Sequence, residues 1–209
     1  SMKNLTIITH PLIQRDLSIL RDRRTPGDRF RLTLSRIAAL MAYEVTKDLS
    51  LRPYSLLTPL EKTKGHRLSQ EVVLVPVLRA GLGMVEGFLN FLPEAKVGHI
   101  GLYRDEETLK PIDYYSKFPR TLRRSLVFLL DPMLATGGSA SAAVSFMKEK
   151  RATQIRLVCL VAAPEGVRHL TRKHPDVAIY TAALDRKLNK KGYILPGLGD
   201  AGDRIFGTT

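Results

Sequence analysis

The sequence predicts an α/β protein with a mostly parallel central sheet flanked by helices and a small hood or flap. Short apolar runs, often β-branched, alternate with stretches in which apolar residues recur every three or four positions. Strands that are apolar throughout are typical of parallel sheets, because crossover helices bury both faces. Two of these runs also end directly in glycine-bearing turns, as in strand–turn–helix units. We therefore expect residues 1–209 to form one layered domain.

Two helices are expected before the first clear strand. Leucines in residues 12–22 indicate a short helix, and the apolar periodicity of residues 30–48 predicts an amphipathic one. We interpret the apolar face of the second helix as core or dimer packing. After it, Pro53 and Pro59 indicate irregular connections, and residues 62–65 indicate a polar loop.

The rest of the chain is expected to alternate between strands and helices. Strands are predicted at residues 72–77, 97–103, 126–130, 155–161 and 177–183, and helices at residues 84–92, 140–150 and 164–174. The polar stretch around residues 104–121 contains prolines and lacks helical periodicity, so we expect a protruding hairpin or a flap there. A glycine-rich tail follows from residue 191.

Composition and charge limit the classes of function. Thirty-three Lys and Arg stand against 20 Asp and Glu, which gives a formal net charge of +13. The basic residues are scattered and lack helix–turn–helix or zinc-finger spacing, so the charge favours anionic ligands without choosing one. No apolar run approaches the ~20 residues that span a bilayer. The single cysteine, Cys159, is expected in the core. These features, with no secretory h-region, favour a cytoplasmic protein without a membrane partner.

The segment from Leu126 to Ser139 combines a buried strand with an acidic residue and a glycine turn. Gly137 permits positive φ, and Ser139 is the predicted N-cap of the helix over residues 140–150. A helix that begins after such a turn directs unpaired N–H groups at one spot, which favours a phosphate. Asp131 lies where open α/β sheets bind ligands and could accept bonds from sugar hydroxyls or help to hold a metal. An ordinary turn between a strand and a helix is the alternative interpretation.

A second turn of this kind follows the strand over residues 72–77. It contains Arg79 beside Gly81 and Gly83. A guanidinium next to accessible backbone N–H groups can bind phosphate oxygens, although most arginines lie at the surface with solvated head groups. Because the carboxyl ends of parallel strands share one edge, Arg79 and Asp131 could face one crevice.

Several common site types are absent from the sequence. The glycine turns match neither a Walker loop nor G-x-G-x-x-G, which disfavours an NTPase and a Rossmann dehydrogenase. No Cys and His cluster suggests structural zinc, and no histidine pairs with a nucleophile elbow. The remaining class of function is a reaction that depends on holding anionic ligands in place.

Three long motifs in the chain resemble those of uracil phosphoribosyltransferases, a type I phosphoribosyltransferase family. Residues 75–83 and 131–139 are similar to its two signature loops, and residues 192–208 are similar to its uracil-recognition segment. Residues 101–108 and 161–166 also fit, so the resemblance runs from about His10 onward. It implies the type I fold and transfer of a phosphoribosyl group from 5-phosphoribosyl 1-diphosphate (PRPP) to N1 of uracil, giving UMP and diphosphate.

The resemblance also implies roles for individual residues. Asp131 would bind the ribose hydroxyls, residues 135–139 the 5-phosphate, and Arg79 and Arg104 the diphosphate. The implied PRPP-binding residues are Arg79, Arg104, Asp131, Pro132, Met133, Leu134, Ala135, Thr136, Gly137, Gly138, Ser139 and Asp200. The implied uracil-binding residues are Ile194, Gly199, Asp200 and Ala201, which would act through main-chain groups. The residues implied to be catalytic are Arg79, Arg104, Asp131 and Asp200.

The implied cofactor is Mg²⁺. Pro132 follows Asp131, so the second adjacent acid of many other phosphoribosyltransferases is absent, and we expect the metal to be held mostly through the diphosphate, near Asp200. Residues 104–117 are expected to close over the site. The family also suggests a GTP effector and a homodimer or larger homo-oligomer.

Two other functions stay open at this point. One is a regulator with the phosphoribosyltransferase fold that binds RNA of pyrimidine genes, which a charge of +13 would suit, although no RNA-recognition motif is visible. The other is an enzyme acting on a purine or on orotate. The carboxylate of orotate would need a cation near residues 194–200, where the sequence has none before Arg204. The basic segment of residues 56–70 has no functional interpretation.

Overall fold

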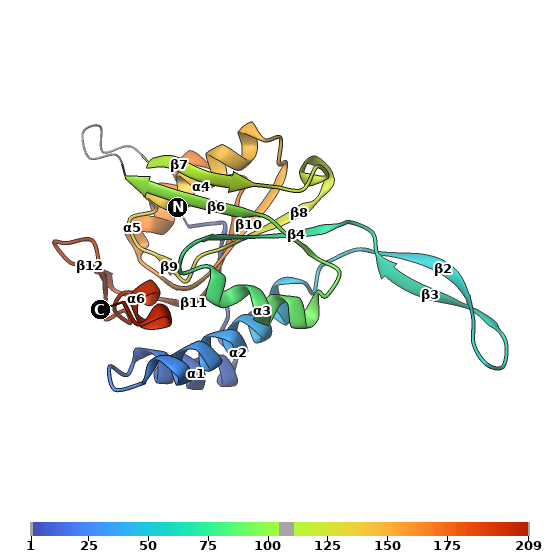
Figure 1. The fold of residues 1–209 in the computed structure, drawn as a ribbon, viewed down its shortest axis with the longest axis horizontal. Coiled ribbons are helices and arrows are strands. Elements are labelled where there is room, and N and C mark those ends of the chain that lie inside the picture. The colour runs from blue at the N-terminus through green and yellow to red at the C-terminus, as the bar shows by residue number, and fades with distance from the viewer. Residues whose placement is uncertain (1, 105–110, 209) are drawn as a thin grey trace.

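The structure is a computed structural model that describes residues 2–104 and 111–208. Within these residues a sheet of nine strands forms the centre of the molecule (Figure 1). Seven strands follow the order β1–β11–β10–β8–β4–β6–β7, while β5 pairs with β4 and β9 pairs with β10. Their bounds are β1 Leu5–Ile7, β4 Val72–Leu78, β5 Lys96–Val97, β6 His99–Arg104, β7 Pro111–Lys117, β8 Leu126–Leu130, β9 Met133–Leu134, β10 Gln154–Ala162 and β11 Ala178–Leu184.

The sheet is mostly parallel, as predicted. Strand β8 lies at its middle and pairs in parallel with β10 on one side and β4 on the other. Among the described strands of this sheet, only β6 and β7 pair in antiparallel fashion. The predicted strand over residues 97–103 is divided at Gly98 between β5 and β6.

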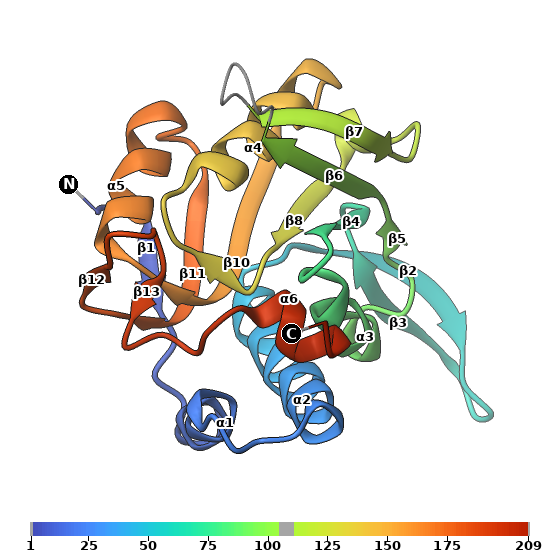
Figure 2. The ribbon, with the colours of Figure 1, turned by 60° about the vertical axis from the view of Figure 1, so that its left-hand side comes forward.

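Helices cover both faces of the sheet (Figure 2). Three pack on one face: α1 Pro11–Arg21, α2 Gly27–Val45 and α3 Leu82–Phe91. Two pack on the other: α4 Gly138–Glu149 and α5 Pro164–Lys173. A short 3₁₀ helix, Leu122–Arg124, precedes β8. All five predicted helices are confirmed, with shifted ends.

Strand β8 illustrates why this layering follows from the sequence. Phe128 and Leu130 belong to the cluster that includes α1–α3, whereas Val127 and Leu129 belong to the cluster that includes α4 and α5. Successive strand residues point to opposite faces, so an uninterrupted apolar run supplies both cores. Cys159 is fully buried in the second cluster, as expected.

Helix α4 begins earlier than predicted. The prediction that Ser139 caps a helix over residues 140–150 is wrong, because α4 starts at Gly138 and Gly137 is the N-cap. Gly137 has a φ of 83°, a left-handed conformation that glycine adopts without a Cβ penalty. Ser139 therefore lies in the first turn, where its backbone N–H belongs to the open amino end of the helix.

The interpretation of residues 53–65 as irregular connections and a polar loop is also wrong. Strands β2 (Leu51–Leu57) and β3 (Lys62–Leu68) pair in antiparallel fashion and project from the rest of the molecule (Figure 1). We call residues 51–68 the arm. Both strands are sheet edges, so Pro53 is tolerated within β2 even though it lacks an N–H.

The C-terminal segment of the chain forms a small strand pair and a short helix. Residues 187–188 and 194–195 form a small antiparallel pair, β12 (Lys187–Leu188) and β13 (Ile194–Leu195), and Ala201–Phe206 form helix α6. None of the described helices is both long and apolar enough to cross a membrane. Of the expected flap, residues 105–110 lie outside the described residues.

Candidate active site

A cavity of about 590 Å³ lies at the carboxyl ends of β4 and β8. It joins three segments that are far apart in the sequence: the turn after β4, the connection between β8 and α4, and the tail. The residues that line it are Ala80, Asp131, Met133, Ala135, Ser139, Lys191, Gly192, Tyr193, Ile194, Gly199, Asp200, Ala201 and Gly202. The structure thus brings the two predicted glycine turns and the predicted recognition segment to one edge of the sheet.

The backbone after β8 is fixed by the neighbouring strand β10. The Asp131 N–H donates to Val158 O at 3.2 Å, and Pro132 O accepts from the N–H groups of Leu160 and Val161. Pro132 and Leu134 are buried. Their side chains therefore anchor the connection rather than contact a ligand.

Asp131 lines the cavity with an environment that disfavours its charged form. Its Oδ1 accepts from the Met133 N–H at 3.2 Å, which closes a small turn. Burial raises the pKa of Asp131 to about 7, and this hydrogen bond opposes the shift only in part. A donor such as a sugar hydroxyl would compensate for the lost hydration of the carboxylate.

The loop of residues 135–139, hereafter the phosphate loop, packs closely on the start of α5. A Cβ added at Gly137 would lie 2.8 Å from Gly166 O. Positive φ and this close approach together require glycine at position 137. The amino end of α4 then opens toward the cavity that Ala135 and Ser139 line. Such an end attracts an anion through its N–H groups and its dipole.

Arg79 stands at the border of the cavity. The turn that carries it sits tightly against β8, since a Cβ at Gly81 would lie 2.3 Å from Leu130 O. Arg79 Nη2 lies 3.4 Å from Asp203 Oδ1 and 3.4 Å from Thr208 Oγ1. Its guanidinium also lies over the Phe206 ring, 5.4 Å from the centroid. The Leu78–Arg79 peptide is cis.

The tail reaches the cavity as β13, a turn and α6. Ile194 is buried and lines the cavity. Gly199 has a φ of 82°, and Asp200 is the N-cap of α6, with its Oδ1 accepting from the Asp203 N–H at 3.0 Å. Ala201 is buried at the start of the helix. The turn presents backbone groups to the cavity, as its glycines suggest.

A partly buried ion pair holds the start of the tail, and sequence reasoning missed it. Arg21 donates to both carboxylate oxygens of Asp185 at 2.8 and 2.7 Å and to Gly197 O at 2.9 Å. The Gly197 N–H in turn donates to Asp185 at 2.8 Å. Burial alone would raise the pKa of Asp185, but the bonds from Arg21 and Gly197 and the charge of Arg21 lower it.

Two arginines considered in the sequence analysis, Arg104 and Arg204, are not among the described residues that line the cavity. Arg104 ends β6, and its side chain lies outside the described residues, as do residues 105–110 of the predicted flap. Arg204 is bound within the protein and is not placed to act as a cation for the carboxylate of orotate. Its guanidinium donates to Leu198 O and to Asp22 O, each at 2.8 Å, and stacks 4.4 Å from the centroid of Phe30.

The cavity also contains residues that sequence reasoning did not select. Lys191 and Tyr193 come from the turn between β12 and β13, and Ala80 and Gly202 adjoin residues that were selected. The lysine lies next to the segment 192–208, so a search for cations beside the predicted motif could have found it. Its nearness to the phosphate loop could not be seen in the sequence, because the two segments are far apart along the chain.

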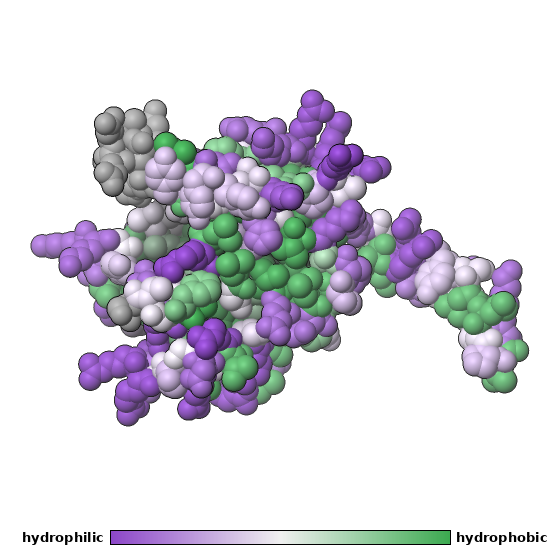
Figure 3. All heavy atoms as spheres, viewed as in Figure 1, coloured by the Kyte–Doolittle hydropathy of each residue, from purple (hydrophilic) through white to green (hydrophobic). Residues whose placement is uncertain are grey.

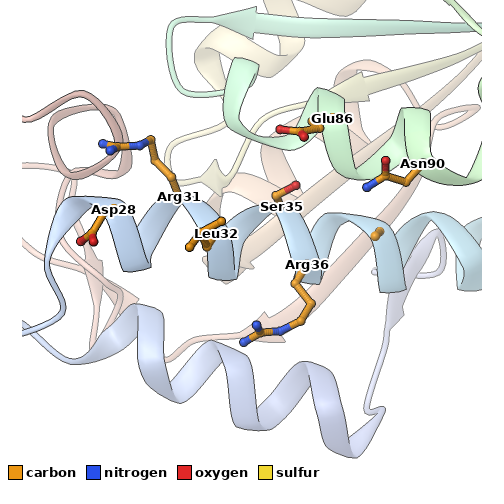
Figure 4. A pocket seen from close by; sticks show the side chains of 8 residues that line it. Asp28, Arg31, Leu32, Ser35, Arg36, Glu86 and Asn90 are labelled. Atoms are coloured by element: carbon orange, nitrogen blue, oxygen red, sulfur yellow. The ribbon is translucent and has the colours of Figure 1, made fainter.

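A second hollow, of about 610 Å³, lies between α2 and α3 (Figure 4). Its two arginines are engaged elsewhere. Arg31 donates to Ile205 O at 2.9 Å, and Arg36 points to α1, where it donates to Asp16 at 2.5 and 2.9 Å. Because both arginines already have hydrogen-bond partners in the protein, this hollow fits an anionic substrate less well than the cavity at the sheet edge.

Two carboxylates of the candidate site could contribute to a Mg²⁺ site. Asp131 and Asp200 line the same cavity, and oxygen ligands suit Mg²⁺. Within residues 2–104 and 111–208, however, no group of three or more His, Cys, Asp or Glu side chains could hold a metal. The donor set therefore fits a metal that a polyphosphate ligand partly coordinates, rather than one caged by the protein.

Fold and site together define the class of protein. A hypoxanthine-guanine phosphoribosyltransferase from Bacillus anthracis has the same fold, with a TM-score of 0.53 at 12% identity over 76% of this chain and 80% of its own. The fold is that of type I phosphoribosyltransferases. The sequence model of the uracil phosphoribosyltransferase family matches residues 7–208. The chain belongs to the uracil phosphoribosyltransferase family.

Individual relatives agree with this assignment. The uracil phosphoribosyltransferase of Finegoldia magna is 57% identical, with 99% of this chain and 100% of the relative covered. That of Salinibacter ruber is 55% identical, with 99% of each chain covered. A solved structure of an Aquifex aeolicus protein has a TM-score of 0.92 at 38% identity and covers 98% of this chain and 99% of its own. These comparisons give no support to an RNA-binding regulator.

Proposed function

We propose that this protein transfers the 5-phosphoribosyl group of PRPP to N1 of uracil, with UMP and diphosphate as products. Family membership over residues 7–208 supports the reaction. The observation that carries it in the structure is one cavity that joins Asp131 and the phosphate loop to the backbone-rich turn of Gly199 to Ala201. Such a cavity can bind a sugar phosphate and a polar base side by side.

The donor would bind along the turn after β8. Asp131 would accept hydrogen bonds from the ribose hydroxyls, and the phosphate loop, residues 135–139, would hold the 5-phosphate at the amino end of α4. Arg79 and Arg104 would contact the diphosphate. Asp200 would lie beside the diphosphate and its Mg²⁺, which supplies neutralisation of the charge that develops on the leaving group.

The acceptor would bind on the tail. Main-chain groups near Ile194, Gly199 and Ala201 can match the alternating acceptors and donor on the edge of uracil. Cytosine carries an exocyclic amine in place of one carbonyl, so a buried donor of the site would lose its partner. Discrimination against cytosine then follows from the cost of an unpaired buried group.

Catalysis in this proposal needs no nucleophilic side chain. Diphosphate leaves C1′ of the ribose as N1 of uracil approaches the opposite face, through a transition state with oxocarbenium character. The C1′–O bond breaks with its electron pair going to diphosphate, the C1′–N1 bond forms, and the proton of uracil N1 is released to solvent. Orientation of the two substrates and electrostatic stabilisation of the leaving group by Arg79 and Arg104 lower the barrier. Closure of residues 104–117 over the site would limit hydrolysis of PRPP.

The proposal includes self-association of the chain, and the exposed leucines of the arm support it. An isolated two-stranded hairpin is only marginally stable in water, yet this one exposes 79% of Leu57 and 95% of Leu60. A second copy of the chain that covered these leucines would bury them and supply the arm with a packing partner. Sedimentation of the protein should show a dimer or larger assembly, and replacing both leucines by serine should weaken it. A wild-type monomer at micromolar concentration would contradict this part of the proposal.

Two further parts of the proposal follow from the family alone. GTP is a candidate effector of the activity, and the cytoplasm is the proposed location. Addition of GTP at submillimolar concentration to the assay of UMP formation tests the first of these directly.

The experiment that tests the proposed function compares four bases. Purified protein is incubated with PRPP, Mg²⁺ and uracil, cytosine, orotate or hypoxanthine, and nucleotide products are separated. We expect UMP from uracil and little product from the others. No UMP with uracil, or a faster reaction with orotate or hypoxanthine, would overturn the assignment.

A further inference from the structure

One cation lines the cavity close to the phosphate loop. Among the described residues that line the 590 Å³ cavity, Lys191 is the only basic one, whereas Asp131 and Asp200 are acidic. It lies in the turn of the hairpin formed by β12 and β13, which we call the hood hairpin (residues 187–195; Figure 2). This lysine has no assigned part in the reaction derived above.

The turn that carries Lys191 is held by one asparagine. Asn189 Oδ1 accepts from the N–H of Lys191 at 2.9 Å and from the N–H of Tyr193 at 3.0 Å, and its backbone O accepts from Gly192 at 3.0 Å. The hood hairpin is also tied to α5, because Glu165 Oε1 accepts from the Leu188 N–H at 3.2 Å. The position of the Lys191 backbone is therefore well defined before any ligand binds.

This turn lies directly beside the phosphate loop. A Cβ placed on Gly192 would be 3.6 Å from Cγ2 of Thr136, an ordinary van der Waals contact. Lys191 precedes this contact point in the sequence and lines the same cavity as Ala135 and Ser139. The four-carbon stem of a lysine lets its ammonium group reach across such a gap.

Charge gives a reason for a cation at this place. The phosphate loop, residues 135–139, contains no basic residue. The amino end of α4 supplies N–H donors and about half a positive charge, which leaves most of the charge of a phosphate monoester uncompensated. A lysine ammonium adds a charge-assisted hydrogen bond. None of the ion pairs in the described part of the chain includes Lys191, so its charge is available.

We propose that Lys191 binds the 5-phosphate of PRPP and of UMP, completing the phosphate loop from the hood hairpin. The inference rests on the proposed function, since it takes the ligand of the loop to be the 5-phosphate. Arg79 lies beside Asp203 and Thr208 and would contact the diphosphate instead. The two cations thus recognise different phosphates of one substrate.

The test compares Lys191 with its neighbour. Lys190 belongs to the same turn and the same charge class but does not line the cavity, so Lys190→Ala is a matched control for Lys191→Ala. Calorimetric titration measures the affinity of each variant for UMP and, separately, for diphosphate. Removal of a hydrogen bond between charged groups predicts a loss of UMP affinity of about 10- to 100-fold in Lys191→Ala. Lys191→Arg should keep most of that affinity, and diphosphate binding should not change.

Thermal unfolding of all variants checks that they fold. Equal UMP affinity in Lys191→Ala and Lys190→Ala would overturn the inference, and so would a loss of diphosphate affinity as large as that for UMP. Wild-type protein that still makes UMP in either case would show that the inference alone had failed. Wild-type protein that neither makes nor binds UMP would contradict both the inference and the proposed function.

Discussion

Arg79 and Asp203 are 124 positions apart in the sequence, yet Nη2 of the arginine lies 3.4 Å from Oδ1 of the aspartate. Thr208 joins them, because its hydroxyl donates to the same carboxylate oxygen at 2.5 Å and lies within 3.5 Å of the guanidinium. These contacts thus join helix α6, at the end of the tail, to the turn after β4. This contact holds Arg79 at the border of the cavity before substrate binds.

Removal of Arg79 tests its part in the chemical step. If the guanidinium stabilises charge on the departing diphosphate, Arg79→Ala should lower kcat by roughly 10²-fold or more, as loss of an oxyanion donor does. Steady-state kinetics of UMP formation measure this, with Arg120→Ala as an exposed control outside the cavity. Near-normal turnover in Arg79→Ala would remove the residue from this role.

Asp203 should act through Arg79 rather than on the substrate. We expect Asp203→Asn to lower kcat/KM about 3- to 10-fold, since one charge-assisted hydrogen bond that positions the guanidinium is weakened. The same change in an Arg79→Ala background should have little further effect, which a double-mutant cycle reveals. Additive losses in the cycle would mean that Asp203 works independently of Arg79.

The raised pKa of Asp131 predicts a pH-dependent cost in stability. In the unfolded chain this carboxyl ionises near 3.8, whereas in the folded protein its pKa is about 7. Between these values the folded state binds the extra proton, so Asp131 makes stability fall as pH rises from about 4 to 7, and the cost is fully present above 7. Asp131→Asn should therefore stabilise the protein at pH 8, by about 4 kcal/mol at most, and have little effect near pH 4.

Urea unfolding of wild type and Asp131→Asn at pH 4.5 and pH 8 measures this difference. The variant should at the same time lose UMP formation, because an amide cannot replace a carboxylate as acceptor for two ribose hydroxyls. A stability difference that did not grow with pH would contradict the burial argument for Asp131.

Gly137 and Gly138 are neighbours with different demands on the backbone. Gly137 has positive φ, and a Cβ there would collide with Gly166 O, whereas the nearest atom to a Cβ at Gly138 is 3.6 Å away. Gly137→Ala should lower stability by about 1–3 kcal/mol and raise KM for PRPP, while Gly138→Ala should leave the melting temperature nearly unchanged. Equal melting temperatures in the two variants would show that the loop relaxes around the new methyl group.

Much of the fold could be predicted because its central strands are buried on both faces. The runs in β4 and β8 are apolar throughout, and β10 is apolar from Leu157 to Ala162. Such runs leave few alternatives to a covered parallel sheet. The arm was missed for the opposite reason. It mixes polar residues with exposed apolar ones (Figure 3), contains Pro53 and is mostly exposed, so its composition resembles that of a loop. Only the backbone pairing of two edge strands defines it.

The candidate site was predictable where one local motif carries several of its residues. The turn after β8 contains an acid, two glycines and a helix start within nine positions. Lys191, the pair of Arg21 and Asp185, and the partners of Arg79 depend on contacts between distant segments, for which the sequence has no local pattern. Ser139 was misassigned because serine is a common N-cap, whereas Gly137, in a left-handed conformation, is the N-cap and starts the helix two positions earlier.

The most direct test of the account is the fate of PRPP followed by phosphorus NMR. Protein, Mg²⁺ and PRPP are mixed with and without uracil, and the signals of PRPP, UMP, ribose 5-phosphate and diphosphate are recorded with time. The account predicts one UMP and one diphosphate for each PRPP consumed, and slow loss of PRPP without uracil. Release of ribose 5-phosphate in place of UMP, or no consumption of PRPP when uracil is present, would contradict it.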